Sequence, residues 1–63
     1  MTLTEWKEKM MEEVEGNVVI SCVMKNVPYH ENTSRYQVYN EEGTYNRTFD
    51  ITTDEDGIII NIT

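Results

Sequence analysis

Residues 2–25 read TLTEWKEKMMEEVEGNVVISCVMK, and the spacing of the apolar side chains changes once within them. Before Gly16 these side chains recur every three or four positions, as on one face of an amphipathic helix: Leu3, Trp6, Met10, Met11 and Val14. After Gly16 they recur at every second position, as on one face of a strand: Val18, Ile20, Cys22 and Met24. A helix followed directly by a strand is therefore the starting point of the fold.

The sequence also marks where this helix begins and ends. Thr2 and Glu5 have the spacing of a capping box, in which the threonine hydroxyl and the glutamate carboxylate each accept a backbone N–H. Gly16 stands where a left-handed residue commonly terminates a helix. We predict a helix over about residues 3–15.

The rest of the chain favours a meander of short strands. Residues 26–34 contain the only proline, Pro28, and are predicted to form a loop. Two acidic turns follow, each ending in a glycine that suits a hairpin: Asn40-Glu41-Glu42-Gly43 and Asp54-Glu55-Asp56-Gly57. They separate three further predicted strands: Ser34–Asn40, Thr44–Thr52 and Ile58–Thr63. The expected fold is α+β, with one helix on one face of a small antiparallel sheet of three to four strands, as a single domain over residues 1–63.

The alternation of side chains predicts a core on one face of this sheet. Trp6, Met10 and Val14 of the helix are expected to pack on sheet residues Ile20, Cys22, Val38, Phe49, Ile51, Ile58, Ile60 and Ile62. The alternation leaves four apolar residues on the opposite face: Val19, Val23, Tyr39 and Ile59. Two interpretations stay open, either an exposed patch that marks an interface or a curled sheet that covers these residues itself.

The net charge of −7 excludes some partners and favours others. Binding to nucleic acid requires clustered lysine or arginine, whereas the five basic residues here are scattered along the chain. Residues 36–63 carry six acids and one base, a net charge of −5, which suits a basic protein surface. The alternative is that the acids serve solubility alone.

Three features bear on location. Cys22 is the only cysteine, so it has no intramolecular disulfide partner. The first residues lack the apolar segment of a signal peptide, and no apolar run is long enough to cross a membrane. We expect a cytoplasmic protein without membrane contact, located in the host cytoplasm if a phage encodes it.

No residue pattern indicates catalysis or metal binding. The acidic run Asp54–Gly57 resembles part of a calcium loop, but threonines stand at both end-ligand positions, Thr52 and Thr63. Cys22 and His30 are the only candidates for a nucleophile and its base, and they supply two ligands where structural zinc needs four. Cys22 falls on the predicted core face and His30 in a loop. We therefore expect no enzyme activity, no cofactor and no metal.

The sequence favours a non-enzymatic protein-binding module with a basic protein as its partner. Tyrosine is enriched at protein interfaces, and a bias toward Ile, Asn, Thr, Tyr and Glu without any alanine fits many small phage proteins. A specific form is a phage-encoded inhibitor that mimics nucleic acid on a host or defence protein. The residues expected to contact the partner are Tyr29, Tyr39, Glu41, Glu42, Asp54, Glu55 and Asp56.

The alternative is a structural or regulatory homo-oligomer, such as a homodimer. It would assemble through the outer sheet face or through edge strands, with Val19, Val23 and Ile59 buried between copies. Arg47 interrupts an apolar strand face, so it either reaches past the edge of the sheet or pairs with an acid.

Overall fold

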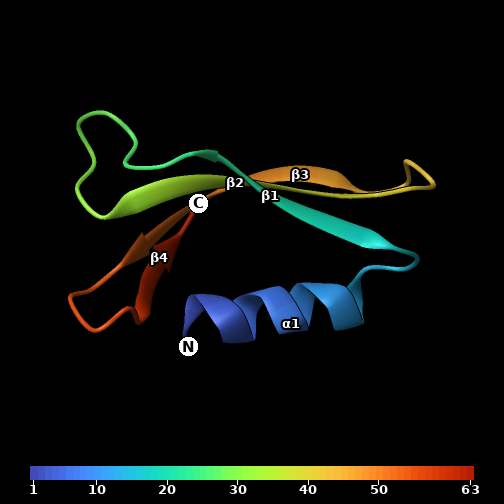
Figure 1. Cartoon of the computed structure of the whole chain (residues 1–63), viewed down its shortest axis with the longest axis horizontal. Coiled ribbons are helices and arrows are strands. Elements are labelled where there is room, and N and C mark those ends of the chain that lie inside the picture. The colour runs from blue at the N-terminus through green and yellow to red at the C-terminus, as the bar shows by residue number, and fades with distance from the viewer.

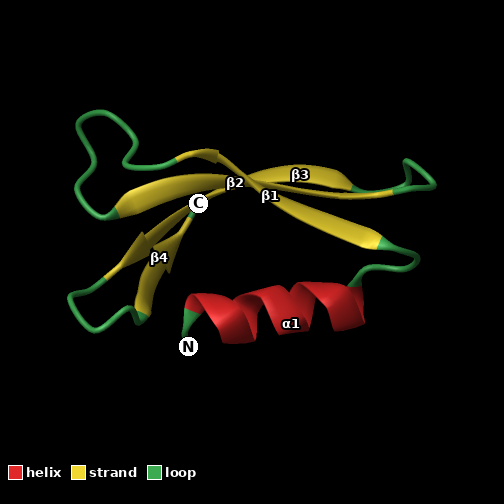
Figure 2. Cartoon of the chain, viewed as in Figure 1, coloured by secondary structure: helices red, strands yellow, loops and turns green.

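One helix lies against one face of a four-stranded antiparallel sheet in the computed structural model, which describes all 63 residues (Figure 1, Figure 2). The strands follow one another in the order β1-β2-β3-β4, each paired with its neighbour in the sequence. The elements are α1 (Leu3–Glu13), β1 (Val18–Met24), β2 (Thr33–Asn40), β3 (Asn46–Thr53) and β4 (Ile59–Ile62). The predicted fold class is confirmed, with four strands.

The capping box predicted at the start of α1 is present. The Thr2 hydroxyl accepts the Glu5 N–H at 3.2 Å, and the Thr2 N–H donates to the Glu5 carboxylate at 2.9 Å. The bond from the Thr2 backbone N–H is the main reason why the pKa of Glu5 lies below its ordinary value, and the Thr2 hydroxyl lowers that pKa further. The helix ends at Glu13, two residues before the predicted end, because Val14 has an extended backbone conformation.

Trp6 forms the centre of the core between the helix and the sheet. Its side chain and those of Val38 and Ile51 are at most 2% exposed. The Trp6 ring meets the Phe49 ring edge-on, with 5.6 Å between centroids, and tilts against the Tyr36 ring at 5.9 Å. Around this centre pack half-buried residues from every element: Leu3, Met10, Val18, Ile20, Tyr36, Tyr45, Phe49 and Ile59.

The alternation predicted for β4 is wrong. Thr52 of β3 is paired with Asn61, but Thr53 is paired with Ile59, so Ile60 is an extra residue in the ladder. This irregularity turns Ile59 toward the core and leaves Ile60 63% exposed. Two other residues expected in the core are also exposed, Ile58 at 38% and Ile62 at 40%, although Ile62 lies opposite the buried Ile51.

A second irregularity changes the end of β1. Cys22 is paired with Tyr36 and Met24 with Arg35, so Val23 has no partner in β2. Met24 therefore lies opposite an outward-facing residue and is 40% exposed, not on the core face as predicted. Cys22 stays on the helix side, next to Tyr36, but is exposed. The prediction that Cys22 is a buried core residue is therefore also wrong.

Candidate functional site

The residues predicted to contact a partner lie at two opposite ends of the sheet. In an antiparallel meander the β1–β2 and β3–β4 connections share one end, and the β2–β3 turn shares the other with the α1–β1 connection (Figure 1). We call residues 25–32 and 54–57 the Tyr29 end, and residues 15–17 and 39–45 the Glu41 end. The molecule is 34 Å long. The structure thus places Tyr29 and the second acidic turn at the same end of the sheet, and Tyr39, Glu41 and Glu42 at the other.

At the Tyr29 end, one aromatic side chain is displayed fully to solvent. Tyr29 is 102% exposed, and its φ of +67° is in the left-handed region. That region is disfavoured for a bulky residue by roughly 1–2 kcal/mol. Asn26 and Asn32 are also left-handed, but asparagine tolerates this conformation. Backbone strain of this kind is concentrated at functional loops, which makes Tyr29 the leading candidate for a contact residue.

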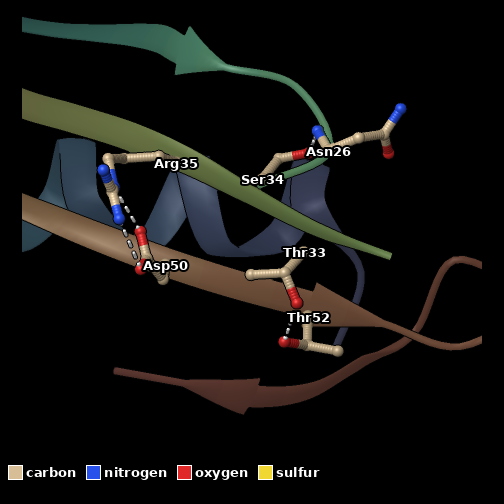
Figure 3. A network of polar contacts seen from close by, with 6 residues as sticks. All are labelled: Asn26, Thr33, Ser34, Arg35, Asp50 and Thr52. Carbon is tan, nitrogen blue, oxygen red and sulfur yellow. Dashed lines mark hydrogen bonds and ion pairs between the residues drawn. The ribbon is translucent and has the colours of Figure 1, made fainter. Parts of the chain in front are cut away.

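The loop that carries Tyr29 is held at its base. Val27 is buried, its N–H donates to the Thr33 carbonyl at 2.7 Å, and its carbonyl accepts the His30 N–H at 3.1 Å. The Asn26 N–H donates to the Ser34 hydroxyl at 3.4 Å (Figure 3). These contacts fix both arms of the loop and leave its tip free to meet a partner.

Two threonines join this loop to the end of β3. The Thr33 hydroxyl donates to the Glu31 carbonyl and lies 2.7 Å from the Thr52 hydroxyl, so Thr52 is the donor in that second bond (Figure 3). The Thr53 N–H donates to the Asn32 carbonyl at 3.1 Å. The Tyr29 loop is therefore connected to the strand that leads into the acidic turn. Sequence reasoning missed this link, because it depends on the pairing of β2 with β3.

The three acids of the second turn have different roles. The Asp54 carboxylate accepts the N–H groups of Asp56 and Ile58, both at 2.9 Å, and so holds the turn together. Glu55 and Asp56 are exposed and their carboxylates have no hydrogen-bond or ion-pair partner in the chain. Glu55 and Asp56 are therefore the acids of this turn that are free to contact a partner.

At the Glu41 end, the acids contact the chain itself. The Asn17 amide donates to the Glu41 carboxylate at 3.2 Å, and the Glu41 N–H donates to the Asn17 carbonyl at 3.2 Å. The Glu42 carboxylate lies so close to Gly16 that a Cβ at that position would overlap it. Tyr39 is 37% exposed and is paired with Val19 on the face away from the helix. Glu41 and Glu42 therefore lie against the α1–β1 connection.

The outer face of the sheet carries an ion pair that the sequence did not predict. Arg35 donates to both carboxylate oxygens of Asp50, at 2.8 and 3.1 Å (Figure 3). This hydrogen bonding is the main reason why the pKa of Asp50 lies below its ordinary value, and the nearby His30 lowers it further. The two residues are directly opposite each other in the β2–β3 register.

This ion pair predicts how stability depends on pH. Because the pKa of Asp50 is lower in the folded chain, the stabilisation is complete above the unfolded-state pKa and is lost as the pH falls through the folded value. We expect the midpoint of thermal unfolding to fall steadily below about pH 4. Asp50→Asn should flatten this dependence, whereas Asp56→Asn, which removes a carboxylate without an ion pair, should keep it. Circular dichroism melts across the pH range test this, and equal pH profiles for the wild type and Asp50→Asn would contradict it.

Cys22 and His30 do not form a catalytic pair. Cys22 is next to Tyr36 on the helix side of the sheet. His30 is close enough to Asp50, on the outer face, for its charge to lower the pKa of that carboxyl group. The structure has no group of three or more His, Cys, Asp or Glu residues placed to hold a metal ion. Arg47 does not pair with an acid, and its guanidinium lies over the Phe49 ring, 5.3 Å from the centroid.

Comparison with protein-family models, with characterised proteins and with solved structures finds no match to this chain. The only helix has 11 residues, and no helix has both the length and the apolar character that a membrane span requires. The candidate site consequently rests on the geometry of the Tyr29 end.

Proposed function

We propose that this chain is a non-enzymatic protein-binding module that docks through its Tyr29 end on a basic surface of a larger protein. The observation that carries the proposal is the full exposure of Tyr29 in a left-handed conformation at the tip of a loop whose base is hydrogen-bonded. A solvated tyrosine at a strained position contributes nothing to the stability of the free chain.

The chemistry of the Tyr29 end suits a tyrosine anchor with acidic residues at the same end of the sheet. A tyrosine ring gives a large contact area with few rotatable bonds, so it is a frequent hot spot of protein interfaces. Glu31 follows Tyr29 by two residues in the same loop, and Glu55 and Asp56 lie in the turn at the same end of the sheet. The net charge of −7 attracts a basic partner over a longer range and accelerates encounter.

The specific form of the proposal is a phage-encoded inhibitor that occupies the nucleic-acid site of a host or defence protein. Its support is the amino-acid composition together with the free acids of the Tyr29 end, Glu55 and Asp56. In that case the chain should displace bound nucleic acid from its partner, whereas an inhibitor that docks elsewhere should leave the nucleic acid bound.

The test is affinity capture from a bacterial lysate, followed by binding measurements on each captured protein. Tyr29→Ala should weaken binding about 30-fold or more, since truncation of a hot-spot residue removes at least about 2 kcal/mol. Glu55→Lys with Asp56→Lys should weaken binding about tenfold, and the effect should grow at low salt.

Two matched controls keep the result specific to the Tyr29 end. Tyr39→Ala removes the tyrosine of the Glu41 end, and Glu8→Lys with Glu12→Lys makes the same change in net charge on the exposed side of α1. Tyr39→Ala should bind like the wild type, and the α1 double variant should lose only the long-range attraction, a smaller loss than that of Glu55→Lys with Asp56→Lys. A captured protein that binds Tyr29→Ala and the wild type equally well would exclude docking through the Tyr29 end.

A further inference from the structure

The two edges of the sheet differ in how they are covered. β4 has only four residues, and the start of the chain runs along it: Thr2 bridges to Ile58, and the Ile59 N–H donates to the Met1 carbonyl at 2.7 Å. β1 has seven residues and is paired on one side alone, with β2. The outer side of β1 is therefore the open edge of this fold.

The hydrogen-bonding groups on that open edge follow from the β1–β2 register. The Glu41 N–H donates to the Asn17 carbonyl, so Asn17 belongs to the β1 positions that bond to β2. Antiparallel ladders alternate, which adds Val19 and Ser21 to these positions. The N–H and C=O groups of the intervening residues, Val18, Ile20 and Cys22, then point to the open edge. Strand groups of this kind are ready to pair with another strand.

β1 carries none of the usual protection against such pairing. Its sequence, VVISCVM, has no charged residue and no proline, and the irregularity at Val23 lies near its end, beyond Cys22. Several of its apolar side chains are exposed: Val19 at 39%, Val23 at 56% and Met24 at 40%. Natural proteins commonly place lysine, proline or a bulge along an edge to prevent association. The unprotected stretch here is residues 18–22.

We propose that β1 pairs with β1 of a second copy of this chain, antiparallel and with Ile20 opposite Ile20. In this register Val18 of each copy lies opposite Cys22 of the other, and each pair exchanges two backbone hydrogen bonds. All the free groups of Val18, Ile20 and Cys22 are then satisfied. The two sheets become one continuous sheet, and the two-fold axis places both helices on the same face.

The charges next to β1 fit a second copy. The same register brings Lys25, just after β1, to the part of the edge where Glu15 of the other copy comes just before its β1, with one residue of offset from the irregularity at Val23. Both residues are exposed and neither has an ion-pair partner within the chain. The like charges of the two copies lie mainly in the turns and on α1, and the edge itself is uncharged. Antiparallel self-pairing therefore brings the lysine of each copy toward the glutamate of the other copy, at both ends of the paired strands.

The first measurement is the solution mass by sedimentation equilibrium. Edge pairing buries little surface, so we expect a weak dimer, in the micromolar to sub-millimolar range, in about 150 mM salt. A wild-type chain that stays monomeric at about 1 mM would overturn the proposal. This measurement is independent of the proposed docking through the Tyr29 end, because the two surfaces are different and neither requires the other.

A cysteine placed at the two-fold axis tests the register. In Ile20→Cys with Cys22→Ser, the two introduced cysteines would lie about 5.5 Å apart between Cα atoms, within the range for a disulfide. In the wild type the two Cys22 residues would be about 13 Å apart along the strands, too far for one. We expect mild oxidation to cross-link the variant and to leave the wild type uncross-linked. If the wild type cross-links through Cys22 and the variant does not, this register is excluded.

A charge exchange tests the proposed Lys25–Glu15 contacts without altering the strand. Lys25→Glu alone should weaken the dimer about tenfold, because both contacts become repulsive. Adding Glu15→Lys restores opposite charges and should recover the wild-type dissociation constant. Glu12→Lys in place of Glu15→Lys is the matched control and should give little recovery. Equal recovery by both would show that net charge alone governs association and would overturn the proposed pairing.

Discussion

Replacing Trp6 by alanine should leave little folded protein at room temperature. Trp6 is 2% exposed and is the only residue of α1 that is fully buried. Truncation of a buried tryptophan destabilises a protein by about 3–5 kcal/mol. A chain of 63 residues has a total stability of roughly 3–9 kcal/mol, so this loss removes most of it. The Tyr36 and Phe49 rings would also lose their aromatic partner.

The measurement is urea unfolding followed by circular dichroism, with Met11→Ala as the control. Met11 is on the same helix but is 58% exposed, so its truncation should change the stability by less than about 0.5 kcal/mol. If Trp6→Ala unfolds at the same urea concentration as Met11→Ala, the helix does not hold the core together in the way the structure shows.

Replacing Asn40 by aspartate should destabilise the chain by about 2–4 kcal/mol. Asn40 is 4% exposed, and its amide donates to the Glu15 carbonyl at 2.9 Å and to the Thr44 hydroxyl at 2.8 Å. Its side-chain oxygen accepts the Tyr45 N–H at 3.1 Å. One side chain thus joins the α1–β1 connection to the β2–β3 turn. Aspartate keeps the shape and the acceptor, but it loses both donated bonds and buries a negative charge.

Asn46→Asp is the matched control for Asn40→Asp. Asn46 accepts a hydrogen bond from Gln37 at 3.1 Å on the exposed face, and an aspartate there also accepts it. Its stability should therefore change by less than about 0.5 kcal/mol. Thermal unfolding of the two variants at pH 7 separates the loss of the buried bonds from the added charge. Equal melting temperatures would show that the Asn40 bonds contribute nothing to the fold.

Local patterns predicted the elements well because each depends on neighbouring residues. Thr2 and Glu5 form the expected cap, and the even positions Val18 and Ile20 face the helix. Prediction of the core failed at Cys22, Ile58, Ile60 and Ile62. Ile60 is the extra residue that shifts the alternation of β4. Cys22 keeps its predicted face but is exposed on β1, an edge strand.

The candidate site was only partly predictable, because some of its contacts depend on which distant segments of the chain lie side by side. Exposed tyrosines and acidic turns are visible in the sequence, and Tyr29 and the Asp54–Gly57 turn do lie at one end of the sheet. The sequence did not show which acidic side chains lack hydrogen-bond partners within the chain. Asp54 and Glu41 accept hydrogen bonds from the chain itself, and that depends on which segments lie side by side.

Local patterns in the sequence were enough to predict the kind and order of the elements, the helix cap and the acidic turns, because short-range sterics and hydrogen bonds decide these. The register of β4, the exposure of Cys22, the Arg35–Asp50 ion pair and the role of Asn40 became visible only in the folded chain. Each of these arises from strand pairing between residues far apart in the chain, and shifting a strand by one residue reverses the face of every side chain that follows. The open edge at β1 has the same origin, since a strand is an edge only by virtue of the sheet around it.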